Sequence, residues 1–213
     1  MIVIFDLDGT VWDSPPGIVG SLVHTFELLD MDVPDRDVLV RHVGTPLRSM
    51  LSELGVEDDH LDRAAVVYRD RYTRTGVYEA ELYPGVVDLP DSLRGGGHRP
   101  ATATSKGHDP TLIMLDHFGI HDRFEFVGAA TMDGRATTKT AVLAGTLTGL
   151  GGPPATDCVM VGDRHHDVAG AAEHHIACIG VTWGYGGEDE LTGAGVWAVA
   201  HSPSEVLSLI GQR

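Results

Sequence analysis

Short runs of apolar, often β-branched residues recur along the chain and predict the strands of a buried parallel sheet. We expect these strands at Ile2–Phe5, Arg99–Ala103, Phe124–Gly128, Cys158–Val161 and Ala177–Val181. Between the runs, apolar residues recur every three or four positions, which is the spacing of an amphipathic helix. The last helix is expected to follow Ser202, with Pro203 at its first position. Strands that alternate with helices predict an α/β fold with a doubly wound parallel sheet.

The stretch from residue 15 to residue 80 breaks this alternation, because it shows helical periodicity and no strand candidate. Within it, Thr45-Pro46 predicts a helix with Thr45 as its N-cap and Pro46 as its first residue. Segments rich in Pro and Gly at 13–17 and 82–85 flank the stretch and are expected to act as hinges. We therefore predict a core of residues 1–14 and 81–213, and a helical cap of residues 15–80 that works as a lid.

Composition and charge exclude several classes of protein. The 213 residues are 42% hydrophobic, which suits a globular chain. Lys and Arg number 15 against 31 Asp and Glu, and the net charge of −16 without any basic run argues against nucleic acid and anionic membrane surfaces as partners. The chain has no apolar window long enough to span a membrane, and its start does not resemble a signal peptide. Cys158 and Cys178 lie in apolar runs, so we expect a cytoplasmic protein without disulfides.

Polar residues gather where the expected strands end, which is where ligands bind in a doubly wound sheet. The segments concerned are Asp6-Leu7-Asp8-Gly9-Thr10, Thr104-Ser105-Lys106 and Gly162-Asp163-Arg164-His165-His166-Asp167. Asp6 and Asp8 at the end of an apolar strand repel each other and favour a divalent cation, and carboxylate oxygens suit Mg²⁺. Asp163 and Asp167 form a second pair that completes an oxygen-rich metal site, although Asp167 also stands where a helix N-cap would.

Other residues in these segments suit a phosphate group. Gly9 allows the backbone to approach a ligand closely, and Thr104 and Ser105 offer hydroxyl and N–H groups to a phosphoryl oxygen. Lysine is scarce, since the chain has two lysines, Lys106 and Lys139, against 13 arginines. This scarcity suggests that the retained lysines are needed. An anionic substrate requires such local positive charge, because the net charge of the chain does not attract it.

These segments resemble all four motifs of the haloacid dehalogenase (HAD)-like phosphatase superfamily. Asp6–Thr10 corresponds to the first motif, Thr104–Lys106 to the second, Lys139 to the third and Gly162–Asp167 to the fourth. Within the superfamily the chain most resembles the phosphoglycolate phosphatase-like group. Further residues that carry this resemblance are Asp13–Ile18, Tyr83–Val86 and Gly180–Gly186. The resemblance covers nearly the whole chain and implies a Rossmann-like core with a helical cap inserted after the first motif.

The resemblance also implies roles for individual residues. Asp6 would be the nucleophile that forms an aspartyl-phosphate, and Asp8 would protonate the leaving oxygen and later activate water. Mg²⁺ would bind the Asp6 carboxylate, the main-chain oxygen of Asp8 and Asp163. Asp167 would support the ion directly or through water.

Other residues bear on how the substrate binds and reaches the site. Thr104 and Lys139 would hold the phosphoryl oxygens, and Lys139 would also offset the charge of Asp6. Arg48 or Arg41, both in the helical insertion, could pair with a substrate carboxylate. Trp12 departs from the family pattern, which often has a smaller apolar residue there, and is expected to narrow the route to the site.

The expected activity is that of a Mg²⁺-dependent phosphomonoesterase acting on a small phosphorylated metabolite, with phosphoglycolate the leading substrate. A nucleoside monophosphatase or pyrophosphatase of the same superfamily is the alternative. A phospho-accepting signalling protein is disfavoured by the helical insertion and by the position of Asp6 near the N-terminus. A silent binding protein is disfavoured because the motif residues are intact. The oligomeric state and the resting orientation of the cap stay open.

Overall fold

The computed structural model describes residues 1–131 and 134–213. They form two compact units, one made of Met1–Trp12 and Leu82–Arg213 and the other of Asp13–Glu81. The two segments that connect the units pair with each other, since β2 (Trp12–Asp13) and β3 (Glu81–Leu82) form a two-stranded sheet. The chain therefore leaves and re-enters the first unit at one place.

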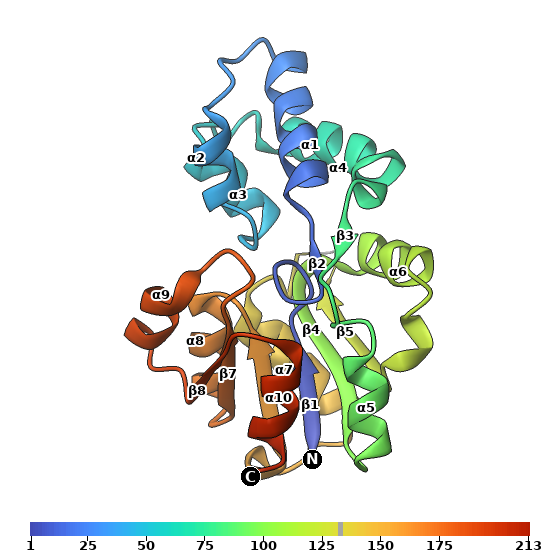
Figure 1. Ribbon diagram of the computed structural model, residues 1–213. Coiled ribbons are helices and arrows are strands. Elements are labelled where there is room, and N and C mark those ends of the chain that lie inside the picture. The colour runs from blue at the N-terminus through green and yellow to red at the C-terminus, as the bar shows by residue number, and fades with distance from the viewer. Residues whose placement is uncertain (132–133) are drawn as a thin grey trace. The chain divides into compact units, whose positions relative to one another are not determined.

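A six-stranded sheet with the order β5-β4-β1-β6-β7-β8 forms the centre of the first unit (Figure 1). Its strands are β1 (Ile2–Phe5), β4 (Arg99–Gly107), β5 (Phe126–Ala130), β6 (Cys158–Gly162), β7 (Ala177–Val181) and β8 (Ala198–Ala200). All of the strand pairs are parallel. The chain moves from β1 to β4 and β5 on one side and to β6, β7 and β8 on the other. This reversal beside β1 creates the switch point where α/β sheets bind ligands.

Helices of the first unit cover the sheet and bury its apolar residues. They are α5 (Leu89–Gly95), α6 (His108–His117), α7 (Lys139–Gly149), α8 (His165–Glu173), α9 (Gly187–Gly193) and α10 (Pro203–Ile210), with 3₁₀ turns η2 (His121–Arg123) and η3 (Ala155–Asp157). Helices α7 and α8 pack against each other, α7 also against β4 and β5, and α8 also against β6 and β7. Their residues Val142, Leu143 and Val168 share one core with Ile4 and Met160 of the sheet.

The second unit is helical, with α1 (Pro15–Leu28), α2 (Arg36–Arg41), α3 (Leu47–Glu53), α4 (Leu61–Arg74) and the 3₁₀ turn η1 (Gly76–Tyr78). Helix α4 packs against α1 and α3. The Arg71 guanidinium of α4 donates to the Ser21 hydroxyl at 3.0 Å and pairs with Glu79 at 3.0 Å. These contacts join α1, α4 and the segment that follows η1.

The expected α/β fold with a parallel sheet is confirmed, but several element bounds differ. Strand β4 continues to Gly107, because Gly107 pairs with Ala130 after a register shift, so Thr104-Ser105-Lys106 lie within the strand. Strand β5 begins at Phe126 rather than Phe124, since residues 121–123 form a 3₁₀ turn. The short edge strand β8 was not predicted from the sequence.

The helix boundaries also contain corrections. Pro46 is the N-cap of α3, with ψ near 137°, so the helix begins at Leu47 and Thr45 lies outside it. The prolines at 15 and 16, expected in a hinge, form the first turn of α1, where proline is well tolerated because the first N–H groups of a helix have no intrahelical partner. Helix α10 begins at Pro203 as predicted, and the Ser202 hydroxyl accepts from Glu205 N at 3.3 Å.

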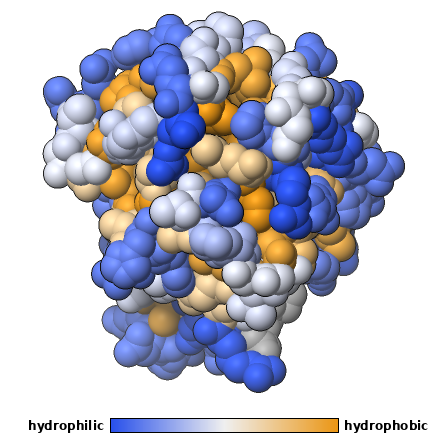
Figure 2. Space-filling model, turned by 90° about the horizontal axis from the view of Figure 1, so that it is seen from below, coloured by the Kyte–Doolittle hydropathy of each residue, from blue (hydrophilic) through white to orange (hydrophobic). Residues whose placement is uncertain are grey.

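No helix in the described part of the chain is long and apolar enough to cross a membrane. The face of the molecule in Figure 2 shows orange hydrophobic areas that are interrupted by blue and white ones. Scattered exposed apolar groups of this kind are ordinary on a folded surface.

Candidate active site

Two neighbouring strands bring the first and fourth sequence motifs together. Strands β1 and β6 pair with Phe5 opposite Val161, and the Asp6 N–H donates to the Val161 carbonyl at 2.9 Å. Asp6 therefore leaves β1 beside the segment in which Asp163 follows β6. The parallel register places both carboxylates at the carboxyl edge of the sheet.

Asp6, Asp163 and Asp167 form a buried acidic cluster. One carboxylate oxygen from each lies within 4.8 Å of the others, and the residues are 5%, 0% and 1% exposed. Asp167 comes from the first turn of α8. Three of the four aspartates expected at a metal site are thus assembled by the fold.

Lys139 places an ammonium against this acidic cluster. It is the first residue of α7, whose N-cap Thr138 accepts from Ala141 N at 3.3 Å. The Lys139 Nζ lies 2.6 Å from Asp6 Oδ1 and 2.9 Å from Asp167 Oδ1, and it donates to the Ala103 carbonyl at 2.9 Å. The first turn of α7 and the Ala103 carbonyl of β4 thus hold the ammonium between two carboxylates.

The acidic cluster carries more negative charge than Lys139 neutralises. Burial raises the pKa of Asp6 to about 6, although Lys139 opposes the rise and Asp167 adds to it. Burial also raises the pKa of Asp163, and Asp167 reinforces that shift. Burial alone would lower the pKa of Lys139, but Asp167 and Asp6 outweigh it and the pKa rises. All three pKa values are raised, which means that this site favours positive charge and disfavours further negative charge.

The donor set fits a hard divalent cation. The acidic cluster offers only carboxylate oxygens, which are the ligands that Mg²⁺ prefers, and its excess negative charge is the quantity that such an ion would offset. Two glycines permit the close packing around it. A Cβ on Gly9 would lie 2.2 Å from Asp163 Oδ2, and one on Gly162 would lie 2.3 Å from Asp167 Cγ. Gly9 also has a φ of +81°, which side chains other than glycine rarely adopt.

Hydrogen bonds fix the orientation of these carboxylates. Asp163 Oδ1 accepts from the Thr10 hydroxyl at 3.2 Å, and Asp163 Oδ2 accepts from Tyr185 N at 2.8 Å. Asp167 Oδ2 accepts from Arg164 N at 3.1 Å, while its Oδ1 faces Lys139. Asp167 therefore serves the helix N-terminus and the acidic cluster together, because its two oxygens point to different partners.

The Asp8 carboxylate lies outside the acidic cluster. Its Oδ1 accepts from Trp12 Nε1 at 2.8 Å, and its Oδ2 lies 3.0 Å from Lys106 Nζ. The family pattern anticipated this separation, since it assigns only the main-chain oxygen of Asp8 to the metal. Lys106 was singled out by lysine scarcity, but its pairing with Asp8 and that of Trp12 were not foreseen.

The remaining expected site residues divide between the two units. Thr104 is buried in β4, and its hydroxyl accepts from Lys106 N at 3.3 Å. Ser105 is half-buried beside it. Arg48 belongs to the helical unit, where its guanidinium pairs with Asp62.

Glu190 of α9 is a supporting residue that sequence reasoning missed. Its Oε1 accepts from Arg164 Nε and from His165 N, each at 2.9 Å, and lies 2.7 Å from His165 Nδ1. Burial alone would raise the pKa of Glu190, but the His165 and Arg164 donors outweigh it and lower the pKa to about 2. No local sequence pattern predicts this contact, because Glu190 and His165 are 25 residues apart in the sequence.

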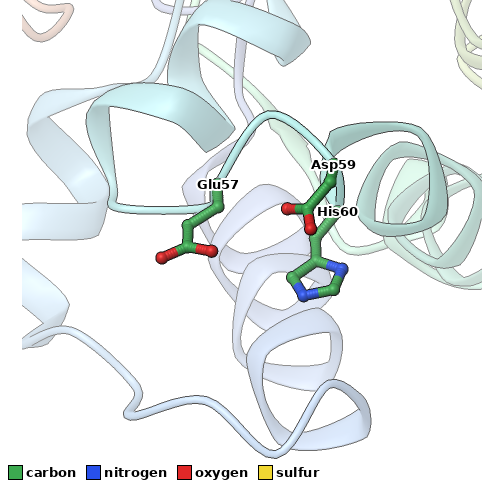
Figure 3. A group of neighbouring side chains, drawn as sticks. All are labelled: Glu57, Asp59 and His60. Carbon is green, nitrogen blue, oxygen red and sulfur yellow. The ribbon is translucent and has the colours of Figure 1, made fainter.

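A second acidic group, Glu57, Asp59 and His60, lies on the segment before α4 (Figure 3). All three residues are exposed. Water solvates exposed carboxylates, so their proximity creates no need for an ion. This group differs from the acidic cluster in that respect, and we assign no site to it.

Comparison with known proteins places these observations in a family. The model of the family described as haloacid dehalogenase-like hydrolase matches residues 3–181. The chain is 40% identical over 201 residues to "Tyrosine-protein kinase PtkA" of Mycobacterium tuberculosis H37Rv, covering 94% of this chain and 68% of that protein. It is 34% identical over 203 residues to a "5'-nucleotidase" of Pseudomonas aeruginosa, covering 95% and 88%.

A solved structure supports the same likeness. The crystal structure of a "predicted phosphatase" from Clostridium acetobutylicum superposes with a TM-score of 0.94 at 32% identity, covering 100% of this chain and 98% of that one. Further relatives carry the names probable phosphatase, pyrophosphatase and phosphoglycolate phosphatase.

Proposed function

Because the chain belongs to the haloacid dehalogenase-like hydrolase family and is a phosphatase of that family, we propose that it hydrolyses phosphomonoesters of small metabolites through an aspartyl-phosphate on Asp6. The observation that carries the proposal is the buried acidic cluster of Asp6, Asp163 and Asp167 with Lys139 against it. Mg²⁺ held by these carboxylates and by the Asp8 main-chain oxygen would neutralise charge on the nucleophile and the phosphoryl group.

The first step would be attack on phosphorus. An Asp6 carboxylate oxygen forms the new P–O bond, and the bond from phosphorus to the ester oxygen breaks. Asp8 gives its proton to the departing oxygen, which leaves as an alcohol. Lys139 and Thr104 hold the phosphoryl oxygens, so that two like-charged groups can meet.

The second step would return Asp6 to its free state. Asp8, now a carboxylate, takes a proton from a water molecule while the water oxygen attacks phosphorus. The bond between phosphorus and Asp6 breaks, and inorganic phosphate leaves. The side chain of Asp8 thus carries one proton out and one proton back in each turnover.

Phosphoglycolate is the leading substrate, supported by the sequence resemblance and by relatives that carry that name. Its carboxylate would pair with Arg48 in the helical cap. The Arg48–Asp62 pair is exposed, with side chains 55% and 88% accessible, so Arg48 can exchange partners with little loss of free energy. A nucleoside monophosphate is the second candidate, favoured by the relative named 5'-nucleotidase.

The test is the release of inorganic phosphate from a panel of esters with and without Mg²⁺. The panel contains phosphoglycolate, nucleoside monophosphates, sugar phosphates and pyrophosphate. We expect Mg²⁺-dependent release with phosphoglycolate ahead, and a lead by a nucleotide would move the proposal to the second candidate. A separate arm with ATP and tyrosine-containing protein addresses the kinase name of one relative. Phosphotyrosine formed there, without ester hydrolysis, would contradict the proposal.

Asp6→Asn tests the nucleophile. The amide keeps the size of the side chain but cannot displace the leaving group, so we expect turnover to fall to the background of the assay. Circular dichroism and thermal unfolding check that the variant remains folded. Mg²⁺-dependent activity retained in pure Asp6→Asn protein would remove Asp6 as the nucleophile.

A further inference from the structure

Trp12 contacts the proposed proton-transfer residue directly. Its indole Nε1 donates to Asp8 Oδ1 at 2.8 Å, and Lys106 takes the other oxygen, so both oxygens of this carboxylate have a partner. The Asp8 side chain is only 8% exposed. Water therefore contributes little to its orientation, which is set by these two side chains.

The ring of Trp12 is itself held in place. Trp12 is fully buried, and its ring stacks on Phe118 with centroids 5.7 Å apart and planes 29° apart. The backbone of the same loop is closed, because Trp12 N donates to the Leu7 carbonyl at 3.2 Å and Gly9 N donates to the Trp12 carbonyl at 2.9 Å. A fixed ring on a closed loop gives its N–H one direction, and that direction is toward Asp8.

A buried indole N–H needs an acceptor, and most side-chain hydrogen bonds in proteins go to backbone groups or water. Trp183 shows that alternative, since its Nε1 donates to the Thr10 carbonyl at 3.0 Å. Trp12 instead donates its only side-chain N–H to the Asp8 carboxylate, which must be correctly oriented for the proposed proton transfer. Filling the core would require the ring of Trp12 but not this hydrogen bond.

We infer that Trp12 is a positioning residue that holds the Asp8 carboxylate in the orientation for proton transfer to the leaving oxygen. The inference rests on the proposed function, in which Asp8 is the general acid and base. It also gives a use to Trp12, which follows the first motif and departs from the family pattern. The bulk of Trp12 serves to carry a hydrogen-bond donor to Asp8.

Trp12→Phe is the variant that separates the hydrogen bond from the bulk. Phenylalanine keeps an aromatic ring to stack on Phe118 and removes the N–H donor. Trp183→Phe is the matched control, because it also removes an indole N–H from the same region, but one that donates to a backbone carbonyl instead of Asp8. The two variants therefore make the same chemical change and differ in which acceptor loses its donor.

The readout is how kcat/KM depends on the leaving group. Protonation by Asp8 matters for an alkyl phosphate such as glycerol phosphate, and little for p-nitrophenyl phosphate, whose leaving group departs as a stable anion. We expect Trp12→Phe to lose about 10-fold or more on the alkyl ester and less than about 3-fold on the aryl ester. Trp183→Phe should change both esters by the same factor. For each variant, the two kcat/KM values are measured on the same protein preparation. An inactive unfolded fraction therefore cancels in the ratio of the alkyl ester to the aryl ester.

Equal losses on both esters, or no loss on either, would show that Trp12 only fills the core and would overturn the inference. Should Trp12→Phe fail to fold, Phe118→Leu loosens the stacking and keeps the N–H, and it should show the same preference for the aryl ester in weaker form. A uniform effect of Phe118→Leu would then count against the inference. If the wild-type protein hydrolyses neither these two esters nor any ester of the panel above, the proposed function fails and the inference with it. Wild-type activity with an unchanged leaving-group dependence in the variants refutes the inference alone.

Discussion

At the scale of single residues, the two lysines are both buried and both paired with aspartates. Each ammonium has a side chain 5% exposed and pairs with an aspartate, Lys106 with Asp8 and Lys139 with Asp6 and Asp167. Buried ion pairs contribute little to stability, because desolvation offsets their attraction. A chain that otherwise uses arginine keeps lysine at two buried positions, and chemistry explains this better than stability does.

Lys139→Ala should therefore lose far more activity than Arg36→Ala. The first change leaves Asp6 and Asp167 without their ammonium partner and removes the proposed contact to the phosphoryl group, which predicts a fall in kcat/KM of about 100-fold or more. Arg36 is exposed at the start of α2, so its loss should change kcat/KM by less than about 2-fold. Phosphate release at saturating Mg²⁺ measures both, and equal effects would refute the argument from lysine scarcity.

At the scale of elements, the segment between β7 and α9 contacts both the segment after β1 and the segment after β6, which carry Asp6 and Asp163. A Cβ on Gly184 would lie 2.3 Å from the Gly9 carbonyl, and Tyr185 N donates to Asp163. Glu190, one element further along, accepts from both Arg164 and His165 at the start of α8. The acidic cluster is thus braced from a third strand end that supplies none of its carboxylates.

Glu190→Gln should destabilise the fold in a pH-dependent way. The pKa of Glu190 is lowered from 4.5 to about 2, so its stabilisation is fully present above pH 4.5 and is lost as the pH falls toward 2. The shift corresponds to about 3 kcal/mol, which partial solvent exposure reduces to about 1–2 kcal/mol. Urea unfolding at pH 6, 5, 4 and 3 should show the gap between wild type and variant closing as the pH falls.

Glu188→Gln on the same helix is the matched control, since Glu188 is exposed. It should leave the free energy of unfolding unchanged across this range. A gap for Glu190→Gln that stays constant with pH would mean that the glutamate acts by shape instead of charge.

The helices and strands also show which parts of the fold can be predicted from the sequence. Buried strands such as β1 and β7 were predicted with their observed bounds, because continuous apolar runs are strong local signals. The β8 edge strand is only three residues long, and its pairing with β7 is a long-range event. The motif aspartates were found from their spacing and the two lysines from their scarcity. Glu190 was missed because its contact with the start of α8 depends on tertiary packing. The Trp12–Asp8 bond joins residues only four apart, but the sequence does not show where the indole N–H points. Local patterns identify residues that carry chemistry and miss those that orient them.

At the scale of the whole molecule, the proposed catalytic residues and the helical insertion belong to different units. The acidic cluster, Lys139, Asp8 and Thr104 all belong to the unit of Met1–Trp12 and Leu82–Arg213, while Arg48 belongs to Asp13–Glu81. This division supports the proposal that the helical unit is a cap that selects the substrate. Reaction type and substrate choice can then vary independently, which fits relatives of similar sequence that carry different names.

Hydrogen exchange on the intact protein can test that separation. Mg²⁺ that binds only the folded cluster should stabilise the first unit by about 2.7 kcal/mol at 100 times its dissociation constant. We expect slower exchange near Gly9, Asp163 and Tyr185, where backbone and carboxylates meet, and unchanged exchange across α1 and α4. Asp163→Asn, which weakens the acidic cluster, should remove the Mg²⁺ effect. Protection spread equally over α1 and α4 would show that metal binding and the helical unit are energetically coupled, and the cap would then take part in assembling the site as well as in selecting substrate.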